Sequence, residues 1–169
     1  MKVLVATHSY SGNGAAVMLL AVLQHWVKTL KWTVDVLMDV NEPVPEDLAR
    51  TGVNVFGTAN PKDYDFALVN TVVSAHFVDM LAPQVRTVLW VHEGETVLWG
   101  SPAPPGQWRH LFELPWKTIF QTPWQPDVVF RSFLTARSRN NAACVRNGLP
   151  SIPADLRPRS KSPGMKRVV

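Results

Sequence analysis

Two glycines, Gly12 and Gly14, follow the first apolar run of the chain, residues 3–6. Glycine allows a sharp turn and a close approach of the backbone to a bound group. Apolar residues with helical spacing come next, at Ala16, Leu19, Leu20, Leu23 and Val27. The pattern predicts a strand, a loop and a helix whose N-terminus favours an anionic group such as phosphate. We expect Gly12, Asn13 and Gly14 to form that loop, although an ordinary tight turn would give a similar pattern.

His92 and Glu93 stand at the end of the most apolar strand predicted in the middle of the chain, residues 86–92. In open α/β sheets, ligands bind outside the carboxyl ends of the strands. An imidazole can donate or accept a hydrogen bond from a ligand hydroxyl. His92 is therefore a candidate functional residue, the alternative being a structural histidine at a strand end.

A dinucleotide-binding site is a weaker alternative for the glycine loop. Its fingerprint needs a third glycine, and Val17 occupies that position. Asp39 lies further along than the roughly 20-residue offset expected for the acid that binds the ribose.

Metal and redox chemistry find little support in the sequence. Cys144 is the single cysteine, so an internal disulfide cannot form. The five histidines show no metal-ligand spacing such as H-E-x-x-H. We expect neither a metal nor a cofactor.

Strand-like and helix-like segments alternate along the chain, which predicts one Rossmann-like α/β domain with a parallel sheet and helices on both faces. The predicted strands are residues 3–6, 33–38, 53–56, 65–70, 86–92, 117–121 and 142–146. Unbroken apolar runs place the first, fourth and fifth of these at the centre of the sheet. We expect a further helix from Pro123, capped by Thr122.

Residues 97–115 carry several prolines and no clear period, which predicts an irregular, mobile loop. Trp99 and Trp108 flank the prolines. Aromatic faces stack on sugar rings and also suit membrane interfaces, so we expect one of these two indoles to be partly exposed.

The composition fits one globular domain. The 169 residues are 46% hydrophobic and 18% charged, with a formal net charge of +4. The late basic residues could meet phosphates, an anionic glycan or a membrane surface, or form a solvated face. We find no nucleic-acid motif, signal peptide or membrane-spanning run, which favours a cytoplasmic protein.

The order of these motifs resembles the N-terminal half of GT-B fold glycosyltransferases of the family 4 type. The motifs are the first strand, the glycine loop, a strand ending in His92-Glu93, a strand before a Thr-capped helix, and a last strand closing on Asn147-Gly148. The resemblance covers residues 1–150. It implies that residues 151–169 are a linker and the start of a missing donor-binding domain.

The resemblance also implies roles for individual residues. His92 would lie near the transferred sugar, with Glu93 as a second candidate catalytic residue and no protein nucleophile. The loop of Gly12, Asn13 and Gly14 would approach the donor phosphates. The expected acceptor contacts are selected by their positions: His8 and Tyr10 precede the glycines, Asn70 and Thr71 end a predicted strand, and Trp99 stands beside the prolines.

The resemblance thus implies the acceptor-side domain of a retaining glycosyltransferase, inactive alone. It would move a sugar from a nucleotide-sugar donor to a glycan or lipid-linked acceptor, with peripheral contact at the inner face of the membrane. The competing interpretation is a non-catalytic α/β binding or interaction domain.

Overall fold

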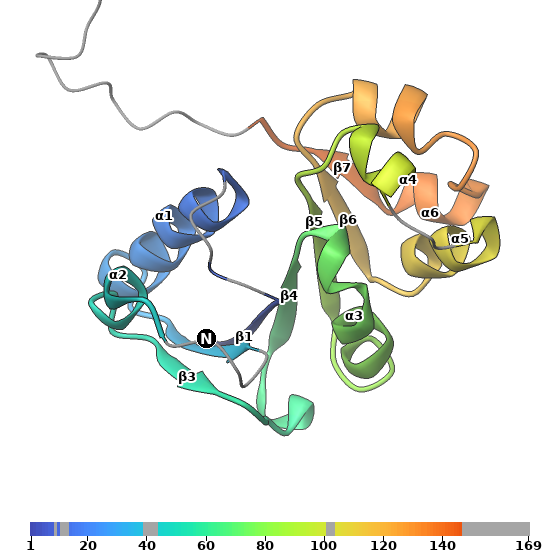
Figure 1. Ribbon diagram of the computed structural model, residues 1–169. Helices are drawn as coiled ribbons and strands as arrows, with labels where there is room; N and C mark the ends of the chain where they lie inside the picture. The colour runs from blue at the N-terminus through green and yellow to red at the C-terminus, as the bar shows by residue number, and fades with distance from the viewer. Residues whose placement is uncertain (9, 11–13, 39–43, 101–103, 147–169) are drawn as a thin grey trace, which may run out of the picture.

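The computed structural model describes residues 1–8, 10, 14–38, 44–100 and 104–146. These residues form a parallel sheet of seven strands in the order β3-β2-β1-β4-β5-β6-β7 (Figure 1). The strands are β1 (Lys2–Thr7), β2 (Thr33–Met38), β3 (Asn54–Phe56), β4 (Phe66–Asn70), β5 (Thr87–Val91), β6 (Lys117–Phe120) and β7 (Ala142–Cys144). The prediction of a parallel sheet with β1, β4 and β5 in the middle is confirmed.

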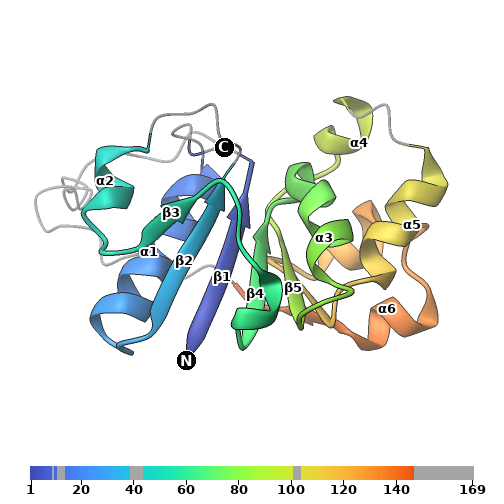
Figure 2. The same ribbon diagram turned by 90° about the horizontal axis from the view of Figure 1, so that it is seen from below.

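Helices cover both faces of the sheet. They are α1 (Gly14–Lys28), α2 (Glu46–Ala49), α3 (Ala75–Leu81), α4 (Thr96–Gly100), α5 (Pro105–Glu113) and α6 (Ala136–Asn140). Helix α1 lies on one face, and α3, α5 and α6 lie on the other (Figure 2). No helix in the described part of the chain is both long and apolar enough to cross a bilayer.

Two hydrophobic cores follow from the alternation of side chains along each strand. Leu68 and Trp90 point towards α1 and pack with the core on that side. Ala67, Val69 and Leu89 point the other way, towards α3 and α5. Burial on both faces explains why these strands read as continuous apolar runs.

The expected irregular loop at residues 97–115 is wrong for much of its length. Helix α4 ends at Gly100 and α5 begins at Pro105, while residues 101–103 lie outside the described residues. The prolines misled the prediction because Pro105 occupies the first position of α5, where a missing N–H costs nothing. Trp108 is buried, whereas Trp99 is 84% exposed, so one of the two indoles is exposed as expected.

The helix expected after Thr122 also differs. A single π-turn, Gln125–Val129, begins there with Trp124 at its N-cap and no side-chain cap. The capping signal belongs further on, where Thr135 and Ser138 form a capping box at the start of α6.

Candidate functional site

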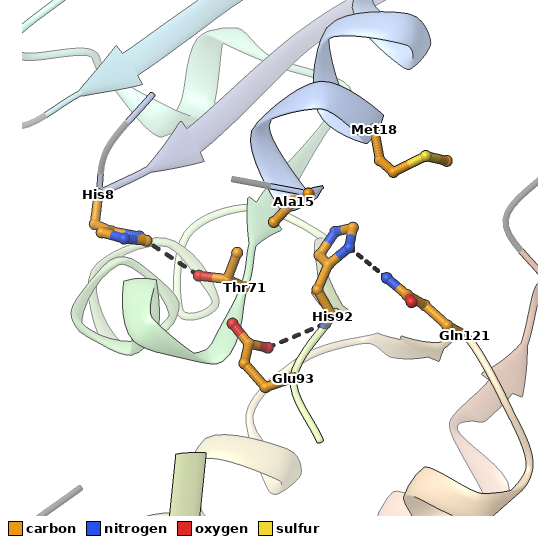
Figure 3. A pocket seen from close by; sticks show the side chains of 8 residues that line it. His8, Ala15, Met18, Thr71, His92, Glu93 and Gln121 are labelled. Atoms are coloured by element: carbon orange, nitrogen blue, oxygen red, sulfur yellow. Dashed lines mark hydrogen bonds between the residues drawn. The ribbon is translucent and has the colours of Figure 1, made fainter. Parts of the chain in front are cut away.

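A hollow of about 450 Å³ opens at the carboxyl ends of β1, β4, β5 and β6 (Figure 3). Its lining residues are His8, Gly14, Ala15, Met18, Thr71, His92, Glu93 and Gln121. β1 and β4 are neighbours in the sheet, but α1 follows β1 on one face and α3 follows β4 on the other. The hollow therefore lies at the topological switch point, where open α/β sheets bind ligands.

The sequence-predicted residues divide into three groups. His8, Gly14, Thr71, His92 and Glu93 come together around the hollow. Among the other expected acceptor contacts, Tyr10 and Asn70 are buried and do not line it, and Trp99 stands exposed on α4. Gly12 and Asn13 lie outside the described residues.

Sequence reasoning missed Ala15, Met18 and Gln121 as lining residues. Gln121 directly follows β6, so the strand-end rule that selected His92 could have selected it too. Ala15 and Met18 lie on the first turns of α1, one helical turn apart, and line the hollow from the side of that helix (Figure 3).

His92 directly follows β5, and its ring is held on two sides. Its Nδ1 meets the Nε2 of Gln121, and its ring packs on Trp90 with centroids 4.3 Å apart. Burial lowers the pKa of His92 to about 4, so the ring is neutral near pH 7. Because an amide nitrogen donates, Nδ1 accepts and the ring proton belongs on Nε2. Nε2 is buried and has no hydrogen-bond partner among the described residues.

Glu93 ties the end of β4 to the end of β5. Its Oε2 accepts hydrogen bonds from the backbone N–H of His92 at 3.0 Å and of Val72 at 3.2 Å. Burial raises the pKa of Glu93, and the hydrogen bonds that the carboxylate accepts oppose that rise. The geometry gives Glu93 a role in holding backbone, and its expected catalytic role stays a prediction.

Thr71 has a backbone conformation that residues other than glycine rarely adopt, with φ 75° and ψ 152°. It is buried, its N–H donates to the Trp90 carbonyl at 2.9 Å, and its hydroxyl lies 3.5 Å from His8 Nδ1. Such strain persists only where the surroundings impose it, and it concentrates at functional sites. The conformation turns the Thr71 side chain towards the hollow (Figure 3).

The depressed pKa of His92 predicts acid sensitivity. The unfolded chain takes up a proton at this residue near pH 6.5, whereas the folded chain does so only near pH 4. Stability is therefore lost as pH falls below about 6.5, and the loss is complete near pH 4. Glu93 acts in the opposite sense. Because its pKa is raised in the folded chain, stability falls as pH rises above the pKa that Glu93 has in the unfolded chain.

Comparing His92→Gln with the wild type isolates the histidine contribution. Between pH 7 and pH 4.5, we expect the wild type to lose about 1–2 kcal/mol more than the variant, after allowance for partial exposure. Urea unfolding at the two pH values measures this difference. Equal losses in both proteins would show that His92 titrates normally.

The described part of the chain contains no group of three or more His, Cys, Asp or Glu side chains that could hold a metal ion. The polar lining of the hollow consists of imidazole, hydroxyl, amide and carboxyl groups. Such groups hydrogen-bond hydroxyls, and the N-terminus of the 15-residue helix α1 adds a favourable field for an anion.

Fold and site together define a Rossmann-like α/β domain with a polar hollow at its switch point. No protein-family model matches the chain, and no curated protein matches its sequence. Two solved structures of Anabaena HepE share its fold. The complex with UDP and glucose has a TM-score of 0.66 and 15% identity, over 88% of this chain and 45% of HepE. The complex with UDP-glucose has a TM-score of 0.67 and 14% identity, over 88% and 44%.

The chain thus spans less than half the length of HepE. At this level of identity the likeness shows the fold. That fold agrees with the Rossmann-like expectation drawn from the sequence.

Proposed function

We propose that this chain is the acceptor-side domain of a retaining GT-B glycosyltransferase of the family 4 type. The enzyme would move a sugar from a nucleotide-sugar donor to a glycan or lipid-linked acceptor. The observation that carries the proposal is the neutral imidazole of His92, held at the switch point opposite the N-terminus of α1. The fold shared with HepE, which was crystallised with UDP, glucose and UDP-glucose, supports it.

The hollow suits an uncharged sugar ring. No lysine or arginine is among the described residues that line it, and His92 is neutral near pH 7. The imidazole of His92 and the hydroxyl-bearing side chain of Thr71 line the hollow, and groups of these types hydrogen-bond sugar hydroxyls. A diphosphate would lie towards Gly14, at the start of α1, where the helix dipole favours negative charge.

The state of Glu93 supports a reaction without a protein nucleophile. It is the single carboxylate among the described residues lining the hollow, and its Oε2 accepts two backbone hydrogen bonds. A carboxylate held in this way is a poor candidate for attack on the sugar. Departure of the donor diphosphate would then rest on electrostatic stabilisation.

A second half would supply most of the donor site. The lining described above offers one helix N-terminus to the phosphates and no aromatic platform for a nucleobase. Such contacts do not offset the several kcal/mol needed to immobilise a nucleotide sugar. We therefore propose that this chain alone has no transferase activity. We also propose a cytoplasmic location with peripheral contact at the inner face of the membrane, which the exposed indole of Trp99 supports.

Titration of the isotopically labelled chain, followed by NMR, tests the proposed function. With UDP-glucose, we expect chemical-shift changes at Gly14, Thr71 and His92 and a dissociation constant of about 1 mM or weaker. Glucose should perturb Thr71 and His92 without Gly14, because it lacks the diphosphate. NAD serves as the comparison ligand.

Two results would contradict the proposal. Absence of shifts at these residues with ligand up to about ten times the expected dissociation constant would remove the sugar site. Preferential binding of NAD at Gly14 would favour the dinucleotide-binding alternative.

A further inference from the structure

The side chain of Gln125 is bound at both ends of its amide. It is 4% exposed. Its Oε1 accepts hydrogen bonds from the backbone N–H of Gln121 at 2.7 Å and of Thr122 at 3.1 Å. Its Nε2 donates to the carbonyl of Glu93 at 2.8 Å and approaches that of Val91 at 3.4 Å. One amide therefore joins the segment after β5 to the segment after β6.

The Gln125 amide connects the segments after β5 and β6 beyond the point where the pairing of these two strands ends. The β5–β6 pairing stops at Val91 and Phe120, so the residues beyond have no ladder bonds to each other. Gln125 bridges that gap. The two residues just past the ladder are His92 and Gln121, whose side chains meet in the hollow (Figure 3).

The local backbone explains how Gln125 reaches this place. It opens the π-turn, and the N–H of Phe130 donates to its carbonyl at 2.8 Å, five residues back. Single π-turns are rare and frequent at functional sites. Glutamine is seldom buried, and a buried amide is stable only when its hydrogen bonds are made.

We propose that Gln125 is a positioning residue of the His92 site, whose amide sets the spacing at which the Gln121 side chain holds the His92 ring. The contact leaves Nδ1 as the acceptor and the ring proton on the buried Nε2. The proposal rests on the proposed function only for the identity of the ligand. The proposed effect of Gln125 on the His92 ring is measurable without any ligand.

The main test is Gln125→Met, which keeps length and neutrality and removes all four hydrogen bonds. We expect the His92 pKa, followed by NMR of the imidazole, to rise from about 4 towards its ordinary value by about one pH unit or more, because the ring is released towards solvent. The ring ¹⁵N shifts should change from a single tautomer to a mixture. The response of His92 to glucose should weaken.

The matched control is Gln84→Met. Gln84 is exposed, and its Nε2 donates to the Met80 carbonyl at 3.0 Å, away from the hollow. The control should leave the His92 pKa and tautomer unchanged. A folded Gln125→Met variant with the wild-type pKa and tautomer would overturn the proposal, since a merely structural role lowers the melting temperature alone.

A measurement on the wild type decides the matter if Gln125→Met does not fold. We expect the side-chain amide protons of Gln125 to exchange with solvent at least about ten times more slowly than those of Gln84, because they are buried and bonded. Equal rates would overturn the proposal. The two proposals can fail separately. If the His92 titration changes as expected in Gln125→Met but the wild type binds neither glucose nor UDP-glucose, the positioning role stands and the proposed function fails.

Discussion

Replacing His92 by alanine is expected to lower turnover by about 100-fold or more in a complete enzyme that contains this chain. The imidazole is neutral, its Nδ1 is engaged by Gln121, and Nε2 has no partner among the described residues. Loss of the imidazole removes a neutral ring that lines the hollow where the reacting sugar is proposed to lie. It also leaves the Gln121 amide without its acceptor. Steady-state kinetics with saturating donor measures the effect on turnover.

A matched control separates chemistry from folding. His110→Ala removes a half-exposed histidine on α5 that pairs with Asp79 at 3.1 Å and does not line the hollow. We expect turnover close to that of the wild type. Circular dichroism should be unchanged in both variants. If His92→Ala is well folded and nearly as active as the control, His92 is a structural residue and the sugar site lies elsewhere.

The sheet was predictable because its physical signal is local. A strand of a parallel sheet is buried on both faces, so it appears in the sequence as a short, continuous apolar run. All five residues of β5 are buried, and residues 86–92 had the strongest such run in the middle of the chain. The alternation with helices then fixes the parallel topology.

Two local predictions were wrong because the residues on which they rest occur in more than one kind of structure. Pro104 and Pro105 indicate a loop in isolation, yet Pro105 begins α5 and Pro104 is its N-cap. Thr122 before Pro123 resembles a helix start, yet a π-turn forms there. The reason is long-range, since Gln125 bonds to one carbonyl at the end of β5 and one just after it, which lie 34 and 32 residues away. No local propensity records such a contact.

The candidate site was partly predictable for the same reasons. The rule that ligands bind at strand ends selected Thr71, His92 and Glu93, and all three line the hollow. It also selected Asn70, whose side chain is buried against the sheet. A difference of one residue at a strand end decides whether a side chain is buried or lines the hollow. The sequence does not determine where that boundary falls. The backbone role of Glu93 depends on the strained turn at Thr71, which only the structure shows.

Replacing Phe112 by alanine is expected to cost about 3–5 kcal/mol of folding free energy, the largest stability effect among these predictions. Phe112 is 1% exposed on α5. Its ring centroid lies 5.2 Å from that of Phe130, 5.9 Å from Phe120 and 6.4 Å from Trp108. These rings fix α5 and the segment after the π-turn against the sheet.

The consequence reaches the site, because Phe120 directly precedes Gln121 at the end of β6. Since a domain of this kind is stabilised by only about 5–15 kcal/mol, the loss is a large share of the total. We expect the melting temperature to fall by about 10 °C. Val17→Ala, at a 61% exposed position on α1, is the control and should change stability by less than about 0.5 kcal/mol. Urea unfolding measures the change in stability of both variants. A loss below about 1 kcal/mol for Phe112→Ala would mean that the aromatic cluster does not hold β6, and that Gln125 and Gln121 keep their places without it.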